Sequence, residues 1–200
     1  LIPEVRERLK GVGYLPKEDA KKIAVVGPTM RGSGIARDVR KDQPYAAYPK
    51  IDFSIAVYDD GDNLARTLVR VDEILESINI IKQVLENLPK GPIRTDLEPK
   101  PYRIGVGAVE APRGEVVHMI MTGDLNRPYR WKVRSPTYNN LPALKIMLIG
   151  VSLADAPITI ASIDPCFSCT DRCIVVKDLS RDTRIKTSLI EMKRIVRCSP

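Results

Sequence analysis

The sequence predicts an α+β domain, mostly helical with a small antiparallel sheet, and three observations support this. Apolar residues recur at spacings of three and four between residues 64 and 88, which is the period of an amphipathic helix. Two strand-like runs, residues 102–109 and 115–121, flank a turn that contains Pro-Arg-Gly, as expected of two neighbouring strands. A chain of 200 residues with 44% hydrophobic residues is long enough to bury a core.

The first 60 residues are predicted to form short helices, a glycine-rich loop and one strand. Residues 1–23 read as a short helix, a turn at Gly11-Val12-Gly13, and a second helix that begins near Pro16. The glycine-rich stretch 24–34 lacks both a following Gly-Lys-Ser/Thr and a dinucleotide-binding spacing, so nucleotide binding is not expected. Apolar and polar residues alternate over 51–57, which predicts a strand.

The long helix should begin after the acidic break at residues 59–62, where an aspartate can cap it, and end before Pro89. We expect its apolar stripe, which includes Leu75 and Ile78, to pack in the core. Its opposite face is predicted to meet solvent or another subunit. The charged residues of that face are Arg66, Arg70, Asp72, Glu73, Glu76, Lys82 and Glu86.

The second half of the chain contains the predicted sheet and two further helices. Residues 89–103 have no periodicity and read as a linker, and residues 130–133 are strand-like. Two apolar helices, 141–150 and 154–162, then lead towards a cysteine motif.

Composition excludes several classes of protein. The net charge is +7, but the basic residues are spread along the chain and usually lie beside acidic ones, and aromatic residues make up only 5%, so nucleic acid is not an expected partner. No apolar run approaches the 18 or more residues of a membrane span. Four cysteines without a secretory signal suggest the reducing cytoplasm. Because the chain begins with Leu1 and not with methionine, we expect it to be part of a longer protein.

The most informative stretch is Asp164-Pro-Cys-Phe-Ser-Cys-Thr-Asp-Arg172, with Cys166 and Cys169 at Cys-x-x-Cys spacing. Two thiolates at this spacing can bind one metal. A structural zinc site would need two more ligands, and the candidates are Cys173, Cys198 and His118. A redox-active pair and a pair of ordinary buried thiols are the other interpretations.

This stretch resembles the C-terminal metal-binding motif of nickel–iron hydrogenase large subunits. It is most similar to the membrane-bound energy-converting branch, with the formate hydrogenlyase, Ech and Mbh types. The resemblance implies that Cys166 is a terminal ligand of nickel and that Cys169 bridges nickel to an iron carrying cyanide and carbon monoxide. Soft thiolate ligands agree with that choice of metals.

Two other segments share the resemblance. Pro112-Arg113-Gly114 is similar to the segment whose arginine overhangs the metals, where a guanidinium can donate to a cyanide nitrogen. Pro136-Thr137 is similar to the segment whose hydroxyl donates to the other cyanide. With Asp164, these residues are expected to surround the metal ligands. The lone His118 is more consistent with a structural role.

The stretch 31–45 resembles one that these hydrogenases share with the 49-kDa-type, quinone-site subunit of respiratory complex I. Residues 126–130, Asn-Arg-Pro-Tyr-Arg, resemble the same subunit. These two stretches indicate the superfamily and do not distinguish its branches.

The chain departs from the hydrogenase pattern in two ways. The second Cys-x-x-Cys, which supplies the other two thiolates, is absent, so the chain offers half a metal site and is interpreted as the C-terminal half of a large subunit. In the family, a maturation endopeptidase cuts after the basic residue that ends the motif, which is Arg172 here. We therefore expect residues 1–172 to form the subunit part and the stretch from Cys173 to residue 200 to form a maturation extension.

The resemblance implies a catalytic subunit that reversibly reduces protons to H2, with Cys166, Cys169 and Arg113 as catalytic residues and a thiolate or Arg113 as the local base. Implied partners are an iron–sulfur small subunit, membrane subunits, the maturation endopeptidase and nickel-delivery proteins. The implied location is the cytoplasmic face of a membrane. The isolated fragment is expected to be inactive.

Two alternatives remain open. One is a complex I-like subunit without nickel that acts on quinone, coenzyme F420 or sulfur compounds. The other is a zinc-binding or scaffold fragment. The metal content of the parent protein distinguishes these alternatives from the hydrogenase interpretation.

Overall fold

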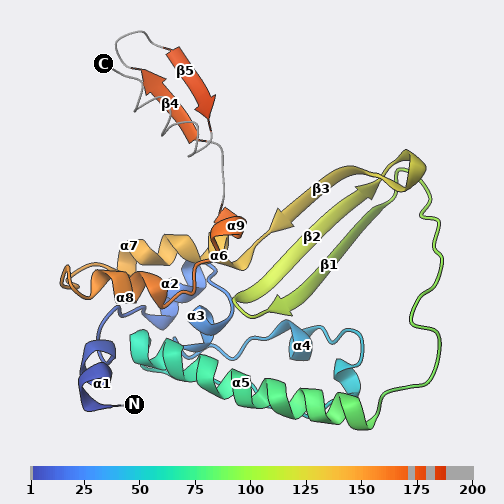
Figure 1. Cartoon of the computed structure of the whole chain (residues 1–200). Helices are drawn as coiled ribbons and strands as arrows, with labels where there is room; N and C mark the ends of the chain where they lie inside the picture. Colours follow the sequence, from blue (N-terminus) through green and yellow to red (C-terminus); the bar gives the residue numbers. More distant parts are fainter. Residues whose placement is uncertain (1, 171–173, 179–182, 188–200) are drawn as a thin grey trace. The chain divides into compact units, whose positions relative to one another are not determined.

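The computed structural model describes residues 2–170, 174–178 and 183–187. The chain divides into two compact units, Leu1–Pro165 and Cys166–Pro200 (Figure 1). The predicted boundary after residue 172 lies inside the second unit. Across the part of the chain that the structure describes, no helix has the length and apolar character that crossing a membrane requires.

The first unit is α+β, and along the sequence some of its helices precede the three strands and the others follow them. The helices are α1 (Pro3–Leu9), α2 (Lys17–Lys22), α3 (Pro28–Arg31), α4 (Val39–Asp42), α5 (Asn63–Glu86), α6 (Pro136–Asn140), α7 (Leu144–Met147) and α8 (Ala156–Ala161). Short 3-10 turns occur at Tyr48–Lys50, Asp124–Asn126 and Leu141–Ala143. The two predicted N-terminal helices are confirmed as α1 and α2. The predicted helices 141–150 and 154–162 form only in part, because the first begins as a 3-10 turn and both end early.

The core joins the two ends of the first unit. Residues from the N-terminal segment, such as Leu15 and Val25, pack against Met147 and Ile163 from the far end of the unit, and all four are at most 1% exposed. Because Ile163 is buried, the chain is anchored immediately before Asp164. The core therefore determines where the residue that precedes the cysteine motif lies.

The helix α5 begins and ends close to the predicted positions. Asp62 caps it, because its carboxylate accepts hydrogen bonds from the backbone N–H groups of Ala65 and Gly11, both at 2.7 Å. The predicted packing of its apolar stripe is wrong, since Leu75 is 61% exposed and Ile78 is 46% exposed. The helix instead turns inward the face that carries Arg66, which is fully buried and finds acceptors there.

The sheet is a three-stranded antiparallel meander in the order β1 (Ile104–Ala111), β2 (Gly114–Thr122) and β3 (Pro128–Arg134), as predicted. His118 pairs with Gly107 and Val133 across the strands. Its Nδ1 accepts a hydrogen bond from Trp131 Nε1 at 3.0 Å, which fits the structural role expected for this histidine. In Figure 1 the strands project from the helical part of the unit, and the segment 87–103 links the end of α5 to β1.

The predicted strand at 51–57 is wrong. The backbone of this segment belongs to no sheet among the described residues. The side chain of Gln83 on α5 binds its backbone instead, accepting from Asp52 N at 2.9 Å and donating to Asp52 O at 2.6 Å. Phe53 is 5% exposed, and Lys41 Nζ lies 4.2 Å from the centre of its ring. The alternating pattern therefore reflects extended backbone with one buried side chain and does not reflect strand pairing.

The described part of the second unit contains α9 (Phe167–Thr170) and an antiparallel pair, β4 (Ile174–Asp178) and β5 (Thr183–Thr187). Arg172 and Cys173, where processing is predicted, lie outside the described residues.

Candidate functional site

The cysteine motif forms a single helical turn. Cys169 N donates to Cys166 O at 3.1 Å, and Thr170 Oγ1 donates to the same carbonyl at 3.3 Å. Side chains three residues apart on a helical turn lie on the same side. Cys166 Sγ lies 3.2 Å from Ser168 Oγ, and both cysteines are half-buried. The turn thus places the two thiols on the same side, and their binding of a single soft metal stays a prediction.

Asp164, the last residue but one of the first unit, is held by Arg113. The Nε of Arg113 donates to the Asp164 carbonyl at 2.8 Å, and its Nη2 donates to the Asp164 carboxylate at 3.2 Å. Asp164 has a φ of +52°, a left-handed conformation that is unfavourable for a residue with a side chain. The two bonds from Arg113 stabilise this conformation, so the predicted site residues Arg113 and Asp164 are in direct contact.

The turn that carries Arg113 is fixed by close backbone packing. Gly114 has a φ of +123°, and a Cβ atom there would lie 2.6 Å from the backbone nitrogen of Gly27. Asn140 on α6 binds the glycine-rich loop next to this contact. Its Oδ1 accepts a hydrogen bond from Val26 N at 2.8 Å, and its Nδ2 donates one to Val26 O at 3.2 Å. The Pro-Arg-Gly turn therefore packs directly against the glycine-rich loop 24–34 at Gly27.

Pro136 and Thr137 lie at the start of α6 and are buried, with Thr137 fully so. Pro112 lies in the turn between β1 and β2 and lines a cavity together with Asp164. Pro112 and Asp164 therefore share one cavity wall. The placement of Arg113 and Thr137 relative to the cysteines remains a prediction.

A cluster of buried charges adjoins this cavity. Arg31 is 1% exposed and donates from Nε to Glu73 at 2.7 Å and from Nη1 to Glu110 at 2.9 Å. Asp38, also 1% exposed, accepts from Arg40 Nη2 at 2.6 Å. Burial raises the pKa of Glu73 and of Glu110, and the nearby Arg31 opposes that rise. The pKa of Asp38 is lowered despite its burial, because Arg40 binds its charged form.

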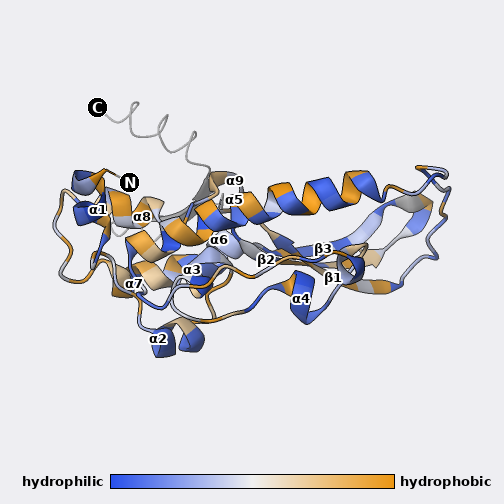
Figure 2. Ribbon diagram, turned by 90° about the horizontal axis from the view of Figure 1, so that it is seen from below, coloured by the Kyte–Doolittle hydropathy of each residue, from blue (hydrophilic) through white to orange (hydrophobic). Residues whose placement is uncertain are grey.

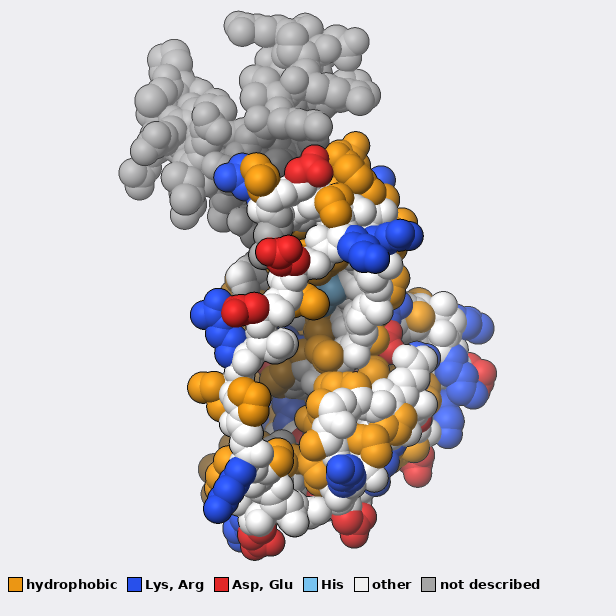
Figure 3. All heavy atoms as spheres, turned by 90° about the vertical axis from the view of Figure 1, so that its right-hand side faces the viewer, with side chains coloured by type: hydrophobic (Ala, Val, Ile, Leu, Met, Phe, Trp, Pro, Cys, Tyr) orange, Lys and Arg blue, Asp and Glu red, His pale blue; other side chains and the backbone are white. Residues whose placement is uncertain are grey.

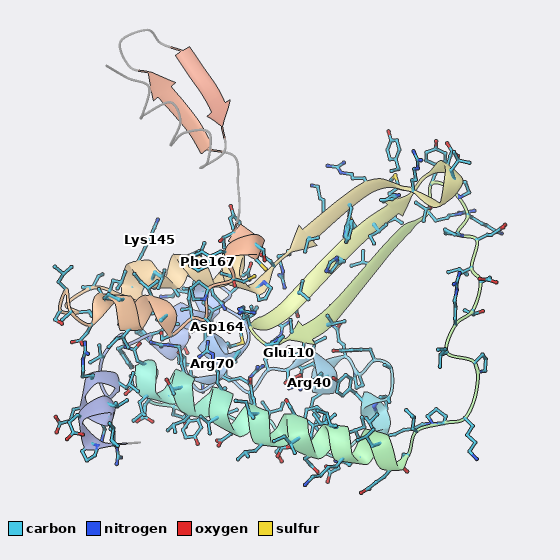
Figure 4. All side chains as sticks on the ribbon, viewed as in Figure 1. Arg40, Arg70, Glu110, Lys145, Asp164 and Phe167 are labelled. Carbon is cyan, nitrogen blue, oxygen red and sulfur yellow. The ribbon has the colours of Figure 1, made fainter. Side chains whose placement is uncertain are left out.

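The cavity has a volume of about 520 Å³ and separates α5 from the turn after β1. Figure 4 shows Arg70, Glu110 and Asp164 reaching it from α5, β1 and the segment after α8. Arg70 Nη1 donates to the carbonyl of Arg66 at 2.9 Å, but its Nε and Nη2 are buried and have no hydrogen-bond partner among the described residues. Burial lowers the pKa of Arg70, whereas the charge of Asp164 raises it. We call this space the Arg70 cavity.

The residues present fit a metal centre in part. Cys166 and Cys169 supply two soft ligands on one turn. Nowhere in the described ranges do three or more His, Cys, Asp or Glu side chains gather around a possible metal.

Sequence reasoning missed the buried cluster. Arg70 and Glu73 were expected on a face that meets solvent or another subunit, and Arg31 was identified only as part of a shared stretch. The available signal was the spacing of Arg66, Arg70 and Glu73, which places all three within one side of a helix. The pairing of Arg31 with Glu110, 79 residues away, has no local signature.

The family model described as the 49 Kd subunit of respiratory-chain NADH dehydrogenase matches residues 3–102 and 98–172. The chain belongs to this family. The matched segments include the stretch 31–45, the hairpin with Arg113 and the cysteine motif.

Similar proteins include both hydrogenase and NADH-quinone oxidoreductase subunits. The chain is 43% identical over 171 residues to the carbon monoxide-induced hydrogenase of Rhodospirillum rubrum, covering 85% of this chain and 47% of the relative. It is 38% identical over 181 residues to an NADH-quinone oxidoreductase subunit of Opitutus terrae, covering 88% of this chain and 43% of the relative.

A solved structure confirms the fold. A chain of the membrane-bound sulfane sulfur reductase, an archaeal respiratory membrane complex, is 35% identical with a TM-score of 0.78, and the match covers 85% of this chain and 48% of that one. This chain thus spans less than half the length of each of these relatives. Its fold is that of the 49-kDa-type and hydrogenase large subunits, as the resemblance implied.

Proposed function

We propose that this chain is part of the catalytic subunit of a [NiFe] hydrogenase that reversibly reduces protons to H2. The observation that carries the proposal is the pair of thiols, Cys166 and Cys169, on one helical turn directly after Asp164 in sequence. Two thiolates of this kind suit nickel and low-spin iron. The 43% identity with a carbon monoxide-induced hydrogenase supports the same function.

The Ni–Fe centre, with cyanide and carbon monoxide on iron, would supply the two-electron chemistry when bound. Cys166 would hold nickel and Cys169 would bridge the two metals. A thiolate at Cys166 can also accept and release a proton. Arg113 uses Nε and Nη2 to hold Asp164, which leaves Nη1 to donate towards a cyanide. The hydroxyl of Thr137 would donate to the other cyanide.

The parent complex would include an iron–sulfur small subunit that delivers electrons and membrane subunits that anchor it. A maturation endopeptidase and nickel-delivery proteins would act on the precursor at Arg172 and Cys173. The similarity to a chain of an archaeal respiratory membrane complex supports a peripheral position on a membrane. We propose its cytoplasmic face as the location.

A second candidate function is a complex I-like oxidoreductase subunit without nickel. The similarity to an NADH-quinone oxidoreductase subunit and to the sulfane sulfur reductase favours this candidate. In it, the substrate would be a quinone, coenzyme F420 or a sulfur compound.

Metal analysis of the full-length parent subunit tests the proposal. We expect nickel and iron together in the wild type, loss of nickel in Cys166→Ser and Cys169→Ser, and retention of both metals in the matched control Cys198→Ser. Zinc that depends on Cys198 would indicate a structural zinc site, and a metal-free but redox-active parent would support the second candidate. The isolated 200-residue chain should produce no H2, because it supplies only two of the four thiolate ligands that the Ni–Fe centre would need.

A further inference from the structure

The long helix α5 presents a continuous apolar face to solvent. Seven large apolar side chains along it and just beyond its end are each between 46% and 67% exposed. They are Val71, Ile74, Leu75, Ile78, Ile81, Leu85 and Leu88, and we call this set the α5 face. At 3.6 residues per turn these positions cover an arc of about 140° over five turns. Figure 2 shows hydrophobic bands repeating along the exposed length of α5.

The opposite side of α5 is already occupied by the chain itself. Ala65, Val69 and Ile80 are buried there, and Arg66 is fully buried. The guanidinium of Arg66 makes four hydrogen bonds, among them one to Ser162 Oγ at 2.9 Å and one to Gly13 O at 2.6 Å. The helix cannot rotate to bury its apolar face without breaking these bonds. The exposure of the α5 face is therefore a fixed property of the fold.

The α5 face continues into the Arg70 cavity at its N-terminal end. Ile74 and Ile78 belong to the α5 face and also line that cavity. Arg70, in line with them, has the buried Nε and Nη2 atoms that lack a partner within the described ranges. Buried donors of this kind are rare in complete folds because each costs free energy, which points to an acceptor other than the described residues. Figure 3 views the molecule from the right-hand side of Figure 1 and shows a hollow in the surface that is bordered by hydrophobic side chains.

We infer that the α5 face docks a second polypeptide segment, helical and apolar along about five turns, which places a carboxylate against Arg70. The segment we propose is the part of the subunit that its relatives contain outside the region matched by this chain. The relatives have ample polypeptide for this role, because the match covers only 47% and 43% of two of them and 48% of the solved chain. An apolar helix packs into such a stripe as helices do within one core.

Two other occupants fit the charges less well. A helix that lies on an anionic membrane is usually rich in Lys and Arg, but α5 carries three basic and four acidic residues. A second copy of the chain would have to offer a carboxylate from the same face. That arc contains Arg70 and Lys82 and no Asp or Glu, so two copies would bring like charges together.

The test uses a chimera in which this chain replaces the matched region of the Rhodospirillum rubrum relative. Ile78→Cys is labelled with a maleimide in the isolated chain and in the chimera, and the labelled peptide is followed by mass spectrometry. We expect labelling to slow by at least about 10-fold in the chimera, since burial in a packed interface excludes the reagent. The control Leu153→Cys, at a site that is 91% exposed in the loop between α7 and α8, should react equally in both.

Co-expression provides a second measurement that does not require the chimera to fold. The unmatched part of the relative, carrying a tag, is expected to retain this chain. Leu75→Gln with Ile78→Gln should reduce retention by about 10-fold or more, whereas Leu153→Gln should not. Arg70→Gln should also weaken retention about 10-fold, while Arg94→Gln, in the exposed linker, should have no effect.

Three results would overturn the inference. Equal labelling rates in chain and chimera would show that the face stays open. Protection that rises with the concentration of the isolated chain would assign the face to a second copy. Protection of the isolated chain by anionic vesicles alone would assign it to a membrane. None of these readouts depends on nickel, so their failure is distinguishable from failure of the proposed function.

Discussion

Replacing Arg31 with methionine should destabilise the first unit in a pH-dependent way. Arg31 is 1% exposed, and its guanidinium lies 2.6 Å from Glu73, 2.9 Å from Glu110 and 3.7 Å from Asp38. Methionine replaces much of the apolar stem but leaves these carboxylates without their shared cation. Removing one partner of a buried ion pair costs about 3–5 kcal/mol.

The pH dependence follows from the carboxylates. Burial already raises the pKa of Glu73 and Glu110 above the ordinary 4.5, and Arg31 counteracts this rise, so its removal raises both values further. A carboxyl group whose pKa is raised by folding stabilises the fold below its ordinary pKa and loses that contribution as the pH rises through the raised value. The variant's loss in free energy of unfolding should therefore be small near pH 5 and large near pH 8. Each pH unit between the wild-type and variant pKa changes the free energy of unfolding by about 1.4 kcal/mol per group.

Urea unfolding of the chain at pH 5 and pH 8, followed by circular dichroism, measures this difference. The control is Arg8→Met, which removes an ion pair with Asp155 in which Arg8 is 53% exposed. Exposed pairs contribute about 0–1 kcal/mol, so the control should change little. If Arg31→Met lowers the free energy of unfolding no more than Arg8→Met does, or by the same amount at both pH values, the interpretation of the buried cluster is refuted.

Three further predictions concern the turn at Arg113 and the tail. Gly114→Ala should destabilise the fold by more than about 1 kcal/mol in thermal unfolding, because its Cβ would meet backbone at 2.6 Å, whereas Gly105→Ala, with open space around it, should cost less. Asn140→Ala should cost about 1–3 kcal/mol, since it leaves a buried backbone N–H without an acceptor, and a change below about 0.5 kcal/mol would contradict this. A parent subunit made to end at Arg172 should acquire less nickel than one made with the tail and then cut. Equal nickel loading would show that the tail has no part in assembly.

Local patterns predicted the elements that local interactions determine. The period of α5, its cap at Asp62 and the three strands follow from spacing and from turn residues, and all are present. The strand predicted at 51–57 failed because alternation signals an extended backbone, while a strand also needs a partner. Here the side chain of Gln83 binds the Asp52 backbone where a neighbouring strand would bind it, and the position of Gln83 depends on the tertiary fold.

The orientation of α5 was the larger error, and it has a physical reason. An apolar stripe normally faces the core of its own chain, because water disfavours its exposure. The opposite side of this helix, however, carries Arg66 and Glu73, whose partners Ser162 and Arg31 come from distant segments. Once those buried bonds form, no surface within the described part of the chain covers the apolar side. A single sequence does not reveal which side of such a helix its own chain covers.

The side chain and the turn of Arg113 are held in place by contacts within the first unit. Arg113 is fixed through its side chain by Asp164, while its carbonyl lies 3.5 Å from Asn140 Nδ2 and the turn after it abuts Gly27. These contacts join segments that are far apart in the sequence and satisfy one another's polar groups. They fix the guanidinium of Arg113 beside Asp164. A preorganised donor does not have to be reoriented when charge appears beside it, which is how an arginine stabilises anionic ligands most effectively.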